Sequence, residues 1–195
     1  MAGTVASHHN GRMVSPSDLA AEIGSWPSSQ LRQWCANLAV STAPTSVNWW
    51  LAVRWSAQSR VYDKDLTALA RRDWAAATLQ LTQCLERFTG YSHWDAIIDE
   101  VNLRCYAIND LGELPGDPAC DVQGLLRAVT GAVTVAPDRA LALASHWRDL
   151  PREQILLLRQ HKRMFGPLAV LADRLPDGPE TDQIRVWFAV RPHLP

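Results

Sequence analysis

The stretch that decides the fold is residues 63–88, which read DKDLTALARRDWAAATLQLTQCLERF. Apolar residues recur in this stretch at steps of three and four, and that spacing places them along one stripe of an α-helix. Gly90 follows the stripe, and glycine is a residue type that commonly ends helices. The stretch therefore predicts one long amphipathic helix. Its stripe consists of Leu66, Ala70, Trp74, Ala77, Leu81, Cys84, Leu85 and Phe88.

The segment that follows carries a second clear apolar face. Residues 92–95 resemble a capping box in which Asp95 takes the place of the usual Glu. The helix that they open has one apolar side. That side is formed by Trp94, Ile97, Ile98, Val101, Cys105 and Ile108.

Pro and Gly residues divide most of the remaining chain into shorter helical segments, and strand-like alternation is nearly absent. We favour a helix over a strand for residues 184–190, because no convincing second strand offers itself as a partner. The sequence thus predicts an all-α fold, an orthogonal array or bundle of about nine short-to-medium helices. The further expected helices lie near residues 16–23, 28–40, 46–59, 121–133, 137–147, 151–165 and 166–175.

Length and composition narrow the class of protein. A chain of 195 residues predicts a single helical domain over residues 14–195, preceded by a flexible polar lead-in at residues 1–13. The net charge of −1 gives no overall attraction to nucleic acid or to an anionic membrane. We see no secretory signal and no apolar run of about 18 residues. The four Cys lack Cys-x-x-Cys spacing, so we expect reduced thiols in a cytoplasm.

Trp is the dominant aromatic residue, with nine Trp against three Phe and three Tyr. Trp is enriched both in thick cores and at contact surfaces. Arg far outnumbers Lys, and Ala, Leu, Arg and Trp are favoured together. Their codons are mostly GC-rich, so the codon bias of a GC-rich bacterial genome is an alternative explanation for the Trp count. The positions of the Trp residues must carry any further argument.

Three Trp residues lie on the helix expected at residues 46–59. At 100° per residue, Trp49, Trp50 and Trp55 point in three well-separated directions. Such a helix is either central to the core or in contact with a partner. Trp and Arg dominate interaction hot spots, so we take these three residues as candidate partner-binding residues. Arg152, Arg159 and Arg163 form a basic stripe on a later helix and are secondary candidates, with a solvated face as the alternative.

Two further patterns suggest other functions. Asp95 and Asp99 lie one helical turn apart and resemble a weak Mg²⁺ site. No second acidic cluster accompanies them, so we favour a solvated helix face as their explanation. Residues 18–38 have the layout of a helix-turn-helix, but Arg32 is the single basic residue there, so phosphate anchoring would be poor.

These observations favour a non-enzymatic helical protein-interaction module, an adaptor or accessory protein of a bacterial cytoplasm. Its partner would be another protein or a second copy of the chain, and we expect no cofactor and no membrane partner. A small-molecule-binding protein or Mg²⁺-dependent enzyme using Asp95 and Asp99 is the alternative. A DNA-binding regulator acting through residues 18–38 is the third. The partner and the oligomeric state cannot be derived from the residue pattern.

Overall fold

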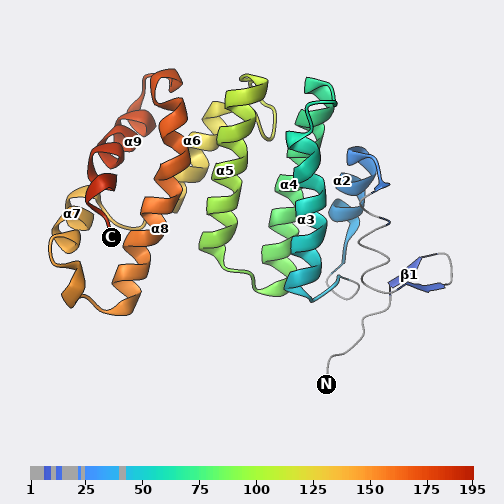
Figure 1. Cartoon of the computed structure of the whole chain (residues 1–195), viewed down its shortest axis with the longest axis horizontal. Helices are drawn as coiled ribbons and strands as arrows, with labels where there is room; N and C mark the ends of the chain where they lie inside the picture. The colour runs from blue at the N-terminus through green and yellow to red at the C-terminus, as the bar shows by residue number, and fades with distance from the viewer. Residues whose placement is uncertain (1–6, 10–11, 15–21, 23–24, 40–42) are drawn as a thin grey trace. The chain divides into compact units, whose positions relative to one another are not determined.

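A computed structural model describes residues 7–9, 12–14, 22, 25–39 and 43–195 (Figure 1). Over this part of the chain the predicted all-α fold is confirmed, with eight α-helices against the nine or so expected. They are α2 Ser28–Asn37, α3 Val47–Tyr62, α4 Ala68–Thr89, α5 His93–Leu111, α6 Val122–Ala132, α7 Pro137–Ala144, α8 Arg152–Leu168 and α9 Pro179–Val190. Three short 3-10 helices are η1 Trp147–Asp149, η2 Ala169–Arg174 and η3 Arg191–His193. The helix expected near residues 16–23 lies outside the described residues, Glu22 excepted.

Two short strands lie within or next to the segment expected to be a flexible lead-in. β1 (Ser7–His9) pairs antiparallel with β2 (Arg12–Val14), and His8 is opposite Met13. No strand was expected here. The Asn-Gly pair between the two strands is a sequence signal for them, because Asn-Gly favours two-residue hairpin connections.

The contacts between residues group the chain into two compact units, whereas the sequence predicts one domain over residues 14–195. The first unit is Met1–Ala96 and the second is Ile97–Pro195, so the boundary falls within the first turns of α5. Each unit is described by itself below. No helix in the described part of the chain combines the length and the apolar character needed to cross a membrane.

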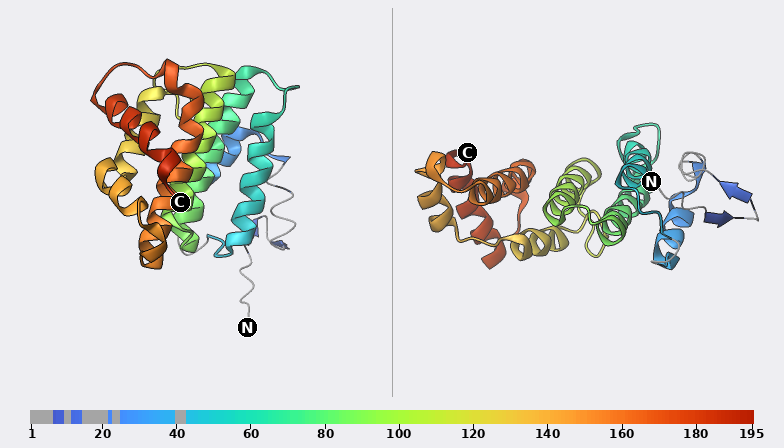
Figure 2. Two further views of the ribbon diagram at one scale, coloured as in Figure 1. Left: turned by 60° about the vertical axis from the view of Figure 1, so that its left-hand side comes forward. Right: turned by 90° about the horizontal axis from the view of Figure 1, so that it is seen from below.

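In the first unit, α4 is the central helix and packs against both α2 and α3 (Figures 1 and 2). The predicted long helix is observed, but it begins at Ala68 rather than near residue 63. The Asp63 side chain accepts the backbone N–H of Asp65 over 3.0 Å, which holds this segment in a turn. The Thr67 hydroxyl then caps the helix by accepting from the N–H of Ala70 over 3.2 Å. Gly90 ends it at φ 68°, as predicted.

In the second unit, α9 packs against α6, α7 and α8. Residues 184–190 belong to this helix, which confirms the helix favoured for them over a strand. The Trp187 ring of α9 is stacked on two α8 side chains, with ring centroids 4.9 Å from His161 and 4.8 Å from Phe165. Our expectation that residues 166 and 167 start a new helix is wrong. α8 continues through Pro167 and passes into η2 after Leu168, since proline removes only one N–H donor so close to the helix end.

Candidate protein-interaction surface

The structure separates the three Trp residues of α3. Trp49 and Trp50 are buried at 6% and 0% exposure, whereas Trp55 is 64% exposed. This corrects the sequence-based assignment for two of the three, because Trp49 and Trp50 lie in the core of the first unit and a partner cannot reach them on the folded chain. Trp55 is the member of the trio on the surface.

An aromatic cluster explains why Trp49 and Trp50 are buried. Their rings meet edge to face with centroids 5.1 Å apart, and the Trp50 ring stacks on Phe88 at 6.0 Å. Trp34 of α2 lies against both of them at 6.0 and 5.6 Å. The indole N–H of Trp50 donates to the carbonyl oxygen of Pro44 over 2.7 Å, so its burial leaves no donor unsatisfied. Helices α2, α3 and α4 therefore share one aromatic core.

Trp55 lies on the outer side of α3 together with three further side chains. Leu51, Gln58 and Tyr62 are four, three and seven residues from it, and this spacing places all four on one side of the helix. Tyr62 is 41% exposed, and its hydroxyl oxygen accepts from the Gln58 amide over 2.7 Å. We call these four residues the α3 outer face. It combines one large apolar ring with groups that form hydrogen bonds.

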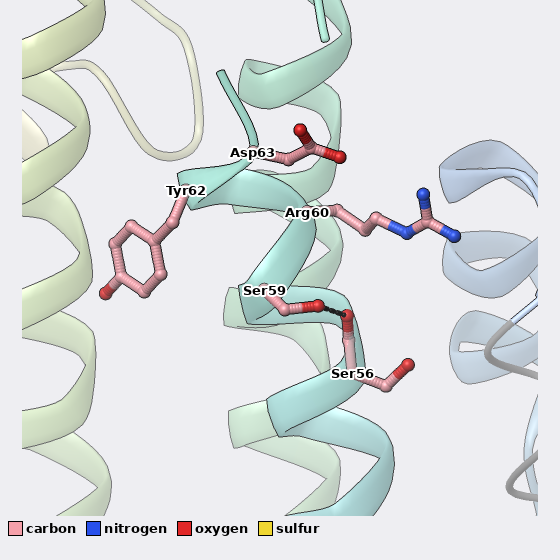
Figure 3. A pocket seen from close by; sticks show the side chains of 5 residues that line it. All are labelled: Ser56, Ser59, Arg60, Tyr62 and Asp63. Carbon is pink, nitrogen blue, oxygen red and sulfur yellow. Dashed lines mark hydrogen bonds between the residues drawn. The ribbon is translucent and has the colours of Figure 1, made fainter. Parts of the chain in front are cut away.

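A shallow hollow of about 580 Å³ lies at the C-terminal end of α3, and Figure 3 shows the side chains that line it. Tyr62 points to one side of the helix and Arg60 to the other, so the polar groups do not converge on one point. The Ser59 hydroxyl donates to the backbone carbonyl of Ser56 over 2.7 Å. This hollow is thus an open continuation of the surface, not an enclosed site. Its lining residues are Ser56, Ser59, Arg60, Tyr62 and Asp63.

The predicted basic stripe lies on the exposed side of α8, in the second unit. Arg152, Arg159 and Arg163 are all exposed, and Leu156 between them is 52% exposed. The neighbouring Lys162 donates from Nζ to the backbone carbonyl of Leu194 over 2.6 Å, which ties α8 to the segment after η3. The opposite side of α8 is buried. It presents Leu158, His161, Met164, Phe165 and Leu168 to the core.

The carboxylates considered as a metal site are both partly buried on α5. Within the described residues no group of three or more His, Cys, Asp or Glu side chains is placed to hold a metal ion. Asp95 and Asp99 thus have no third ligand of these types in that part of the chain. Asn102 lies three residues after Asp99 on the same helix. Its side-chain amide donates to the backbone carbonyl of Ile98 over 2.8 Å, so it forms a hydrogen bond within α5.

The segment considered as a helix-turn-helix is described only in its second half. Its first helix was expected at residues that lie outside the described part of the chain, apart from Glu22. The second helix, α2, exposes Gln30, Arg32 and Gln33 and buries Leu31 and Cys35. A single Arg on the exposed side gives little attraction to phosphates.

Two features of the first unit gave no signal in the sequence. The Cys84 thiol lies against Cys35, donating to its carbonyl oxygen over 4.0 Å, although the two residues are 49 positions apart. Arg71 is also buried, and its Nε donates to the carbonyl of Val61 over 2.7 Å. Residue types and spacings do not reveal such contacts, because they depend on which helices pack together.

Comparisons with protein-family models, with curated proteins and with solved structures gave no match for this chain.

Proposed function

We propose that this chain is a non-enzymatic helical protein-interaction module, an adaptor or accessory protein of a bacterial cytoplasm. In this proposal the α3 outer face contacts another protein or a second copy of the chain. The observation that carries the proposal is the exposure of Trp55 on a helix whose other two Trp residues are buried.

The energetics of Trp55 support a contact. Full burial of a large apolar side chain stabilises by about 1.5–3 kcal/mol, and an exposed Trp forgoes most of that amount. A partner that covers the ring recovers it. Trp is also the residue type most enriched at the positions that dominate binding free energy.

The surroundings of Trp55 fit the composition of an interface. Leu51 beside it is partly buried and packs against the core of the first unit, while Gln58 and Tyr62 offer hydrogen-bonding groups at its side. Aromatic centres surrounded by polar groups are typical of interfaces that assemble and separate. The proposed partner therefore offers an apolar pocket for one indole ring, rimmed by hydrogen-bond acceptors and donors.

The α8 basic stripe is proposed as a secondary contact. Arg152, Arg159 and Arg163 surround the exposed Leu156, so an acidic partner surface with an apolar centre would fit it. Exposed charges mainly change the association rate and its salt dependence, whereas a buried indole changes the dissociation rate. The two surfaces are thus distinguishable in kinetic measurements.

The experiment compares three forms of the chain as bait in affinity capture, followed by titration with the purified captured protein. Trp55→Ser removes the proposed anchor. Leu69→Ser is the matched control, since Leu69 is 68% exposed on α4 and lies outside the α3 outer face. We expect affinity to fall about 30-fold or more for Trp55→Ser, the factor that corresponds to about 2 kcal/mol, and to stay unchanged for Leu69→Ser.

The homomeric version is tested separately by light scattering across a concentration series. A dimer that Trp55→Ser converts to a monomer supports self-association through the α3 outer face. A monomeric chain that captures no protein, or a partner that binds the Trp55→Ser variant as tightly as the original chain, contradicts the proposal.

A further inference from the structure

The α3 outer face, from Leu51 to Tyr62, has the residue spacing of a seam between two helices. Its four residues follow one another at steps of four, three and four. This is the spacing of the a and d positions of a coiled coil, where each helix presents a narrow stripe to the other. At 1.5 Å per residue the stripe is about 16 Å long, or three helical turns. The spacing therefore favours a helix as the structure that covers this face.

The outer side of α3 is uncharged along this stripe. Within α3 the charged residues are Arg54, which is buried, and Arg60, which points to the other side of the helix from Tyr62 (Figure 3). Ala52 and Ser59 border the stripe and are exposed. Small side chains at such positions let a second helix approach closely. A second α3 helix can therefore lie against this face without bringing like charges into the stripe.

The sizes of the side chains along the stripe favour one direction for the second helix. In a parallel pair each residue faces its own copy, so Trp55 meets Trp55 and Tyr62 meets Tyr62. In an antiparallel pair Trp55 faces Gln58 of the second copy, and Tyr62 faces Leu51 of that copy. Each large ring then lies opposite a smaller side chain, which is how packed helices fill the space between them. Antiparallel helices also place the positive end of one helix dipole beside the negative end of the other.

We infer that two copies of this chain associate through an antiparallel pair of α3 helices. This inference rests on the proposed function, because it names the second copy as the partner of the α3 outer face. The pair has a two-fold axis that passes between Trp55 and Gln58, so each contact occurs twice. Both Trp55 rings, each 64% exposed on the single chain, become covered and recover apolar burial.

The association is measured by sedimentation velocity over a concentration series of the full chain. We expect a monomer–dimer equilibrium whose dissociation constant rises about 30-fold or more in Trp55→Ser. Leu69→Ser is the matched control, because Leu69 is exposed on α4 outside this face, and it should leave the dissociation constant unchanged. Since the stripe is uncharged, the dissociation constant of the original chain should change little between low and high salt.

Two charged double variants test the direction of the pair. In the antiparallel pair Ala52 of one copy lies on the same side of the seam as Ser59 of the other. Ala52→Lys/Ser59→Lys brings like charges together there, and we expect the dissociation constant to rise about tenfold or more. Ala52→Glu/Ser59→Lys brings opposite charges together and should dimerise at least as tightly as the original chain. Both positions are exposed, so thermal unfolding should show that the two variants stay folded.

Three results would overturn the inference. The first is a chain that stays monomeric at every concentration. If that monomer captures a different protein through Trp55, the proposed function stands without the second copy, and if it captures none, both fail. The second is a dimer that forms equally well in Trp55→Ser. The third is an equal dissociation constant for the two charged variants, because in a parallel pair positions 52 and 59 of the two copies lie on opposite sides of the seam.

Discussion

Arg54 on α3 donates from Nε to the hydroxyl of Thr82 on α4 over 2.8 Å, and both side chains are buried. The Thr82 hydroxyl in turn donates to the carbonyl of Thr78 over 3.1 Å. One hydroxyl thus accepts a bond from the neighbouring helix and donates one within its own. Such pairing matters because a buried polar group left without a partner costs more than the bond itself contributes.

Replacing Thr82 by Val keeps the shape of the side chain and removes both bonds. We expect the free energy of unfolding to fall by about 1–3 kcal/mol, since the Arg54 Nε loses a buried acceptor. The control is Thr130→Val on α6, whose hydroxyl donates to the carbonyl of Leu126 in its own helix over 2.9 Å. Urea unfolding should show a loss of only a few tenths of a kcal/mol for the control. Equal losses of unfolding free energy in the two variants would show that the α3–α4 hydrogen bond stabilises the fold no more than a bond within one helix does.

Trp50 and Trp55 lie on one helix, but we expect substitution by Ala to change the free energy of unfolding by very different amounts at the two positions. Trp50→Ala removes a fully buried indole from the aromatic core, so the free energy of unfolding should fall by about 3–5 kcal/mol. Trp55→Ala removes an exposed ring and should change it by no more than about 0.5 kcal/mol. Thermal or urea unfolding of the two variants measures the difference. A large loss for Trp55→Ala would mean that the ring supports the fold and would weaken its assignment to a partner.

Gly90 and Gly131 form a second matched pair. Gly90 ends α4 at φ 68°, and a Cβ added there meets nothing within 4 Å, so Gly90→Ala strains only the backbone. We expect a loss of about 1–2 kcal/mol from placing an L-residue in the left-handed region. Gly131 lies in the last turn of α6 and is equally open, and Gly131→Ala should stabilise by up to about 1 kcal/mol. Unfolding curves that shift in the same direction for both variants would contradict this assignment.

His161 predicts a pH dependence for the second unit. Its Nδ1 donates to the carbonyl of Leu157 over 2.8 Å, so the neutral ring carries its proton on Nδ1. Burial lowers the pKa of His161, opposed in part by this hydrogen bond. Above about pH 6.5 the ring is neutral in both the folded and the unfolded chain, so it contributes no pH dependence to the free energy of unfolding. Below that pH the unfolded chain takes up the proton first, so stability falls as the pH falls towards the folded-state pKa.

The measurement is urea unfolding at several pH values between 8 and 5, for the original chain and for His161→Leu. The slope attributable to one proton is at most about 1.4 kcal/mol per pH unit. We expect His161→Leu to flatten the profile below pH 6.5. An unchanged profile in His161→Leu would show that this ring is not the group that titrates.

Local sequence determined the helices, because a helix is formed by residues that are neighbours in the chain. The apolar stripe of residues 63–88, the stop at Gly90 and a helix start near residue 46 were all predicted. The structure places the cap of that helix at Ser46, whose hydroxyl accepts from the N–H of Trp49 over 3.3 Å. The predicted start of the long helix was wrong by five residues, because the turn at Asp63 competes with the first helical turn. For the candidate site, local sequence determined only the residue types and the side of the helix on which each residue lies.

Which of those residues are exposed was decided by tertiary packing. Periodicity showed that Trp49, Trp50 and Trp55 point in different directions, but only the positions of α2 and α4 determine which directions are covered. The contact between Cys35 and Cys84 and the bond between Arg54 and Thr82 join residues 49 and 28 positions apart. Residue spacing carries no information about such pairs, since they meet only where separate helices pack together.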